Sequence, residues 1–208
     1  MMIFINILLI AGLFFVFAFS HTYLASLKFK EKLVLAIGPK IAFYRLFYNV
    51  ISVIVFYAIY QIMPKPDVII YDLQFPYDIV ILVLQFSSLY GLVYTGFKIN
   101  GKEFLGLSQI KRYLNNNYDV KQLDEKYELR TNGIFNYSRH PIYFFSILFL
   151  GLRPYMDLFY FIFFICITVY FFIGSFYEEK KLVQLFGKEY IEYQKKVPGI
   201  FPIKIFYK

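Results

Sequence analysis

The chain has 208 residues, of which 59% are hydrophobic and only 17% are charged. Soluble domains are usually about half apolar and about a quarter charged, so this composition excludes an ordinary soluble domain. The net charge of +8 does not indicate nucleic-acid binding, because the basic residues lie between long apolar runs. The composition predicts an all-α integral membrane protein whose partner is the lipid bilayer, with no nucleic-acid partner.

The first apolar run begins at Ile3 and has neither a basic leader nor a small-residue cleavage site, which predicts a retained span rather than a removed signal peptide. A transmembrane helix needs about 20 mostly apolar residues. Four runs meet or nearly meet this length: 3–25, 42–63, 78–98 and 157–177. A fifth run, 141–152, is long enough only if the polar segment 133–140 enters the membrane interface. Arg153 and Pro154 predict a tight turn, so the last two spans should form a hairpin.

Beyond the last span, residues 178–193 predict a cytosolic helix, because Leu182, Leu185 and Phe186 recur at helical spacing. We therefore expect one domain over the whole chain, residues 1–208. Its expected parts are three N-terminal spans (residues 1–98), a cytosolic loop with a motif (99–140), a helical hairpin (141–177), and a cytosolic helix with a tail (178–208).

Basic residues collect in alternate connections between the apolar runs. Residues 28–45, residues 98–139 and the tail after 177 together hold 20 Lys and Arg, whereas residues 64–77 and the hairpin turn hold 2. Loops rich in Lys and Arg stay on the cytosolic side. The charges predict five spans, with the N-terminus outside and the C-terminus in the cytosol.

Two polar clusters lie at the predicted cytosolic ends of the last two spans. Arg139 and His140 precede Pro141, which suits a first helical turn, and such a helix terminus beside an arginine can bind an anion. Glu178 and Glu179 follow an aromatic span, where a cationic ligand would offset the cost of two carboxylates near lipid. Alternatively, the first pair only marks the interface and the second pair begins a cytosolic helix and pairs with nearby lysines.

His21 lies at the predicted cytosolic end of the first span, on the same membrane face as both clusters. A lone interfacial histidine can be structural or functional, and both interpretations stay open. The single cysteine, Cys166, and the two histidines do not make up a zinc site, so no metal is expected. The sequence also has no hydrolase, P-loop or dinucleotide-binding motif.

The C-terminal third resembles a known superfamily, the isoprenylcysteine carboxyl methyltransferases, which also includes phospholipid N-methyltransferases and NnrU-like proteins. The resemblance covers about residues 131–202. It rests on Arg139-His140-Pro141-x-Tyr143, an apolar hairpin, and then Glu178-Glu179-x-x-Leu182-x-x-x-Phe186-Gly187-x-x-Tyr190-x-x-Tyr193. Shorter segments resemble the methanethiol S-methyltransferase subgroup: His21 to Ser26, Tyr44 to Asn49, Phe104 to Gln109, and Arg153 to Met156.

The resemblance implies an enzyme that uses S-adenosylmethionine, held between the last two spans and the C-terminal helix. Its implied catalytic residues are Arg139, Glu178 and His21. The residues implied in cofactor binding are Tyr137, Arg139, His140, Pro141, Tyr143, Glu178, Glu179, Tyr190 and Tyr193.

The expected acceptor is a small lipophilic molecule, above all a thiol like methanethiol. A prenylated cysteine carboxylate and a phospholipid amine are alternative acceptors. A further alternative is a non-enzymatic membrane accessory protein like the NnrU group.

Overall fold

The computed structural model describes residues 1–124 and 126–203, so the end of the predicted tail, residues 204–208, lies outside the described residues. The chain forms two compact units. The first comprises Met1–Pro64 and Ile99–Tyr127, and the second comprises Lys65–Lys98 and Glu128–Lys208.

The first unit is built on two apolar helices joined by an amphipathic one. α1 (Met2–Ala25) packs against α3 (Tyr44–Ile62), and α2 (Leu27–Ile37) with the 3-10 helix η1 (Gly38–Phe43) connects them. Ser26 separates α1 from α2, because its hydroxyl accepts the Phe29 amide at the start of α2. Two short helices, α5 (Gly101–Leu105) and α6 (Leu107–Leu114), complete this unit.

Gly106 makes the turn between α5 and α6 in the segment that resembles the methyltransferase loop. Its φ is +91°, and a Cβ there would lie 2.7 Å from the backbone nitrogen of Leu46, so glycine is required. Buried Glu103 holds the same segment. Its carboxylate accepts both Nη groups of Arg112, at 2.8 and 3.0 Å, and the Lys126 amide at 3.1 Å.

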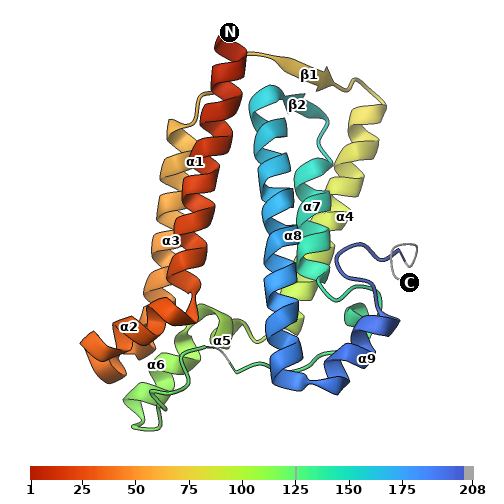
Figure 1. Cartoon of the computed structure of the whole chain (residues 1–208). Helices are drawn as coiled ribbons and strands as arrows, with labels where there is room; N and C mark the ends of the chain where they lie inside the picture. The colour runs from red at the N-terminus through yellow and green to blue at the C-terminus, as the bar shows by residue number, and fades with distance from the viewer. Residues whose placement is uncertain (125, 204–208) are drawn as a thin grey trace. The chain divides into compact units, whose positions relative to one another are not determined.

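The second unit contains a helical hairpin and the helix that packs on it. Figure 1 shows α4, α7 and α8 side by side, with a two-stranded antiparallel ribbon of β1 and β2 at one end. Its elements are β1 (Ile69–Asp72), α4 (Tyr77–Lys98), η2 (Gly133–Asn136), α7 (Pro141–Gly151), β2 (Tyr155–Asp157), α8 (Leu158–Phe186) and α9 (Lys188–Lys196). The sequence grouped α4 with the N-terminal spans, but α4 packs most extensively on α7.

Four helical segments are long and apolar enough to span a membrane: Met2–Ala25, Leu27–Ile62, Tyr77–Lys98 and Leu158–Phe186. They confirm the predicted all-α membrane fold. α7 has 11 residues and is therefore about 17 Å long, whereas the hydrocarbon core is about 30 Å thick. The count of five spans stays a prediction.

The predicted helix boundary at residue 178 is wrong. α8 continues without a break through both glutamates to Phe186 and ends at Gly187, whose φ of +56° favours glycine. Helix α9 then runs from Lys188 to Lys196. The strands β1 and β2 were not predicted, because runs of four and three residues carry too little alternation to be recognised.

The contact between α4 and α7 depends on a glycine. The ring of Phe145 lies where a Cβ of Gly91 would be, whereas a Cβ at Gly96, on the same helix, would meet nothing within 4 Å. Buried Thr95 donates its hydroxyl to the Gly91 carbonyl at 2.7 Å. Gln85 ties the two helices together through a 3.0 Å hydrogen bond to the Phe149 carbonyl.

We therefore predict that Gly91→Ala and Gly96→Ala change stability in opposite directions. Gly91→Ala should destabilise the protein by about 1–3 kcal/mol, because the methyl group overpacks the contact with Phe145. Gly96→Ala should stabilise it by up to about 1 kcal/mol through helix propensity alone. Thermal unfolding of the purified variants in one detergent measures both, and equal effects would contradict the packing described.

Candidate active site

The site is built around an ion pair between the two arms of the hairpin. Arg139 lies just before α7, and Glu179 lies within α8. Arg139 Nε donates to Glu179 Oε1 at 2.8 Å, and Nη2 lies 2.7 Å from the same oxygen. The two side chains are 4% and 18% exposed, so the pair is largely shielded from water. Glu179 is also held from the other side, because its Oε2 accepts Gln194 Nε2 at 2.9 Å.

The same arginine holds the end of α9 and the chain that follows it. Its Nη1 donates to the carbonyls of Gln194, at 3.0 Å, and Val197, at 2.5 Å. Ser138 adds hydrogen bonds from its hydroxyl to the carbonyls of Gly199 and Ile200, at 2.7 and 2.9 Å. The guanidinium is therefore committed to protein partners on Nε, Nη1 and Nη2, and its direct effect is to position Glu179 and the C-terminal segment.

His140 links the two glutamates. Its Nε2 lies 3.0 Å from Glu179 Oε1, and its Nδ1 lies 3.5 Å from Glu178 Oε2. Burial alone would lower the pKa of His140, but the hydrogen bonds to Glu178 and Glu179 outweigh it and raise the pKa above 6.5. The site thus favours the imidazolium, which can donate from both ring nitrogens.

Glu178 differs from its neighbour in being only partly satisfied. Its side chain is 39% exposed, and its Oε2 accepts the hydroxyl of Tyr143 at 3.1 Å. Its Oε1 has no hydrogen-bond partner within residues 1–124 and 126–203. Tyr143 stacks between the rings of His140 and Phe171, with centroids 5.4 and 5.0 Å apart and interplanar angles of 9°. A carboxylate oxygen beside aromatic faces is suited to a cation.

Tyr190 and Tyr193 of α9 belong to an apolar cluster next to these charged side chains. Tyr190, Tyr193 and Val197 are buried together against Leu182 and Phe186 of α8. The Tyr193 hydroxyl donates to the Phe135 carbonyl at 2.5 Å, and burial raises the pKa of Tyr193 to about 12. The Tyr190 hydroxyl is buried and has no partner in the part of the chain that the structure describes. A buried hydroxyl without a partner is costly, which is consistent with a polar ligand group at this position.

The structure brings seven of the predicted site residues into one cluster: Arg139, His140, Tyr143, Glu178, Glu179, Tyr190 and Tyr193. Buried Pro141 opens α7 as predicted. Tyr137 is 70% exposed and, among the described residues, forms no hydrogen bond or ring contact with the cluster. His21 lies in the first unit, where Tyr48 Oη is 2.8 Å from its Nε2 and Ser52 Oγ is 3.0 Å from its Nδ1.

Sequence reasoning did not select Gln194, Ser138 and Phe171 as site residues. Gln194 follows Tyr190 by four residues on one helix face, which is the signal that would have found it. Ser138 stands within the recognised motif, directly before Arg139. Phe171 is one of many aromatic residues in its span, so nothing in the sequence distinguishes it.

Together these features define an α-helical membrane protein with a charged, partly open site where its hairpin meets the helix that follows. The sequence pattern of the phospholipid methyltransferase family matches residues 79–189, which cover α4, the hairpin and the start of α9. The chain belongs to this family, and the predicted kinship with membrane methyltransferases is confirmed.

Curated relatives match nearly the whole chain. Methanethiol S-methyltransferase 1 of Bradyrhizobium diazoefficiens is 31% identical over 201 residues, 95% of this chain and 66% of the relative. Methanethiol S-methyltransferases of Pseudomonas deceptionensis and Crocosphaera subtropica are 28% and 26% identical, over 89% and 94% of this chain and 69% and 74% of their own length. The chain thus spans about two thirds of the length of these relatives. No solved structure is significantly similar.

We predict that His140 makes stability depend on pH. A folded-state pKa raised above 6.5 contributes stability that is fully present below 6.5 and is lost as the pH rises through the raised pKa. The stability difference between the wild type and His140→Asn should therefore shrink as the pH increases past that range. Thermal unfolding of both proteins across a pH series measures it.

His21→Asn is the matched control for this series, because it replaces the other histidine of the chain. The stability difference caused by His140→Asn should shrink with increasing pH in the His21→Asn protein as it does in the wild type, which separates the effect of His140 from that of His21. A difference between the wild type and His140→Asn that grows with increasing pH would contradict the charged His140 described here.

Proposed function

We propose that the protein is an S-adenosylmethionine-dependent methyltransferase whose acceptor is a small lipophilic thiol. The observation that carries this proposal is the partly exposed Glu178, whose Oε1 lacks a protein partner next to the Tyr143 and Phe171 rings. Near the end of a membrane-spanning helix, a carboxylate oxygen without a partner is costly even though His140 Nδ1 lies 3.5 Å from the other oxygen of Glu178, and it suggests a cationic ligand.

The residues present suit S-adenosylmethionine, which combines a carboxylate, an ammonium, a sulfonium and an adenosine. Glu178 would hold its positively charged part. Because His140 and Phe171 cover the two faces of Tyr143, Phe171 at the end of the stack would be the ring that lies against the sulfonium or adenine. The Tyr190 hydroxyl would supply a hydrogen bond that it lacks in the protein alone. The amides of the first turn of α7, after Pro141, would favour the carboxylate.

In this proposal Arg139 and Glu179 do not contact the ligand and act by positioning other residues. Their donors and acceptors are taken up by each other, by His140 and by the segment after α9. They position Glu178 and the Tyr190 face instead of contacting the substrate. This differs from the catalytic role that the family resemblance implies for Arg139.

The chemistry needs alignment and the removal of one proton. The bound cofactor supplies a methyl group on a positively charged sulfur, which is a ready leaving group. The acceptor sulfur would take this methyl group as its bond to the cofactor sulfur broke, and the thiol proton would have to leave because the thiolate is the nucleophile. Glu178 Oε1 is the proton acceptor that the cluster offers, because the two carboxylates raise the pKa of His140 against the effect of burial and so make His140 a poorer base. His21, bonded to Tyr48, is the other candidate base.

The choice of a thiol rests on the relatives, three of which carry the name methanethiol S-methyltransferase. A phospholipid amine is the alternative that the family's own name favours. The two acceptors differ in size and in where they reside, so a direct comparison of acceptors distinguishes them.

We also propose that the N-terminus lies outside and that the C-terminus and the site are cytosolic. The connections with 20 of the 22 basic residues would then be cytosolic. The pairing of β1 with β2 supports this arrangement, because it joins the two connections that are poor in basic residues. Leu158 and Glu178 are 20 residues apart, or about 30 Å along a helix, which matches the distance between opposite interfaces.

Replacing Glu178 tests the proposal directly. Glu178→Gln should weaken binding of S-adenosylmethionine about tenfold or more, because a hydrogen bond to a charged group contributes about 1.5–3 kcal/mol. Glu189→Gln, an exposed carboxylate on α9, is the matched control and should bind as the wild type does. Isothermal titration of the purified, folded proteins measures both affinities. Equal affinity in all three proteins, or no binding by the wild type, would refute the proposal.

A further inference from the structure

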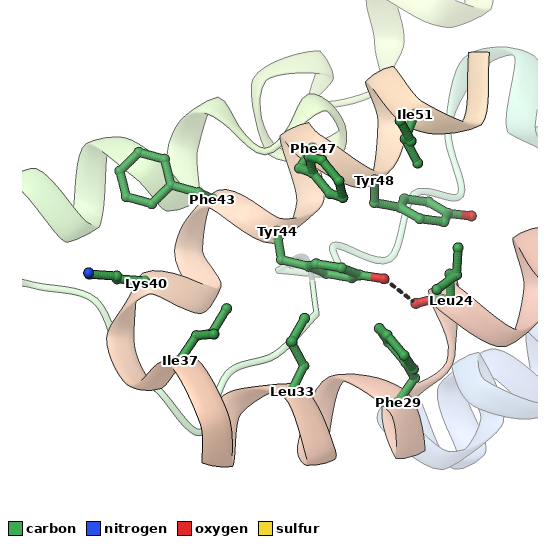
Figure 2. A pocket seen from close by; sticks show the side chains of 10 residues that line it. All are labelled: Leu24, Phe29, Leu33, Ile37, Lys40, Phe43, Tyr44, Phe47, Tyr48 and Ile51. Carbon is green, nitrogen blue, oxygen red and sulfur yellow. Dashed lines mark hydrogen bonds between the residues drawn. The ribbon is translucent and has the colours of Figure 1, made fainter. Parts of the chain in front are cut away.

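The first unit contains a cavity that the proposed methyl-transfer chemistry does not use. It has a volume of about 460 Å³, within the range of roughly 300–1,000 Å³ typical of sites for small organic ligands. Figure 2 shows its walls: Phe29, Leu33 and Ile37 of α2 face a row of aromatic side chains from η1 and α3, and Leu24 closes the end near Tyr48. It is about fifteen times the ~30 Å³ share of one water, far larger than a short thiol needs.

The walls of this cavity offer a ligand almost no polar group. The hydroxyl of Tyr44 donates to the Leu24 carbonyl at 2.9 Å, and that of Tyr48 bonds to His21 at 2.8 Å. Both hydroxyls are thus satisfied by the protein, and the tyrosine rings present hydrocarbon to the cavity. An extended apolar chain is the ligand that such walls bind.

A single cation stands at one end of the cavity. Lys40 lies at the opposite end from Leu24 and Ile51 (Figure 2). Lys40 is exposed and has no ion-pair partner among residues 1–124 and 126–203, whereas Lys30, on α2, is buried and paired with Asp124. A ligand that fills the cavity therefore needs an apolar body with one anionic end.

The helix that forms one wall has the character of a membrane-surface helix. Phe29, Leu33 and Ile37 recur every four residues and form its apolar face, while Lys28 and Lys32 are exposed. Amphipathic helices with lysines on the polar face lie in the membrane interface and attract anionic lipids. A membrane lipid is therefore the ligand that fits both the apolar cavity and its position at the membrane interface.

We propose that this cavity, which we call the α2–α3 groove, binds one acyl chain of an anionic phospholipid whose headgroup phosphate contacts Lys40. The apolar walls favour an acyl chain, and the positive charge of Lys40 favours a lipid with a net negative headgroup. This proposal does not rest on the proposed methyl-transfer chemistry, and its test does not use activity.

The test is photolabelling of the purified full chain in phosphatidylcholine nanodiscs that contain a small fraction of phosphatidylglycerol with a diazirine in one acyl chain. After irradiation, adducts should concentrate on peptides from residues 24–51. An excess of unlabelled phosphatidylglycerol should suppress them, and an excess of phosphatidylcholine should not.

Two kinds of variant separate the wall from the charge. Leu33→Trp and Ile51→Trp fill the groove from opposite walls, and each should remove most adducts, so the test survives if one variant fails to fold. Lys40→Gln should lower labelling by phosphatidylglycerol about fivefold, the effect of one lysine near an anionic membrane surface. It should lower the weaker labelling by a diazirine phosphatidylcholine less, because the choline group of that lipid already balances the charge of its phosphate.

The matched controls lie on the exposed side of α2. Leu35→Trp, at a residue that is 88% exposed, and Lys32→Gln should label as the wild type does. Adducts spread evenly over all the apolar helices, or unaffected by both groove-filling variants, would overturn the site. Equal labelling by the two lipids, or a Lys40→Gln variant that labels as the wild type does, would overturn its selectivity for anionic lipid.

Discussion

The second unit depends on the buried ion pair between Arg139 and Glu179. It joins the start of α7 to the far half of α8, and through the Gln194 and Val197 carbonyls the same guanidinium fixes the segment after α9. Breaking a buried pair by removing one partner costs about 3–5 kcal/mol, because the other charge is left uncompensated. A buried pair of this kind is weak evidence for added stability, and we infer that its role here is to fix one arrangement of the hairpin and the C-terminal segment around the site.

The continuity of α8 gives the two adjacent glutamates different tasks. Neighbouring residues of an α-helix point about 100° apart, since 3.6 residues make one turn. Glu179 therefore points to Arg139, His140 and Gln194, whereas Glu178 points to Tyr143 and stays partly exposed. One carboxylate organises the protein, and its neighbour remains available to a ligand. A helix that began at residue 178, as the sequence suggested, would not fix this division.

Long apolar runs were the most predictable part of the fold. In lipid a chain must satisfy its own backbone groups, so runs near 3–25, 42–63 and 78–98 became helices within two residues of those bounds. The extension of α8 past Glu178 was not predictable, because Arg139, 40 residues earlier, compensates Glu179. Motif resemblance selected the residues that cluster around Arg139, but local pattern gave no sign that Tyr137 points to solvent or that Gln194 completes the network.

Methyl transfer to a small thiol is the function proposed for this protein, and a comparison of acceptors is its decisive test. Purified protein is incubated with methyl-labelled S-adenosylmethionine and, separately, methanethiol, a phosphatidylethanolamine and a farnesyl-cysteine analogue. With the wild type, label should appear in the volatile thioether, and with Glu178→Gln little label should appear there. Label in the phospholipid or the farnesyl ester instead, or no transfer to any of the three by folded protein that binds the cofactor, would contradict the proposed function.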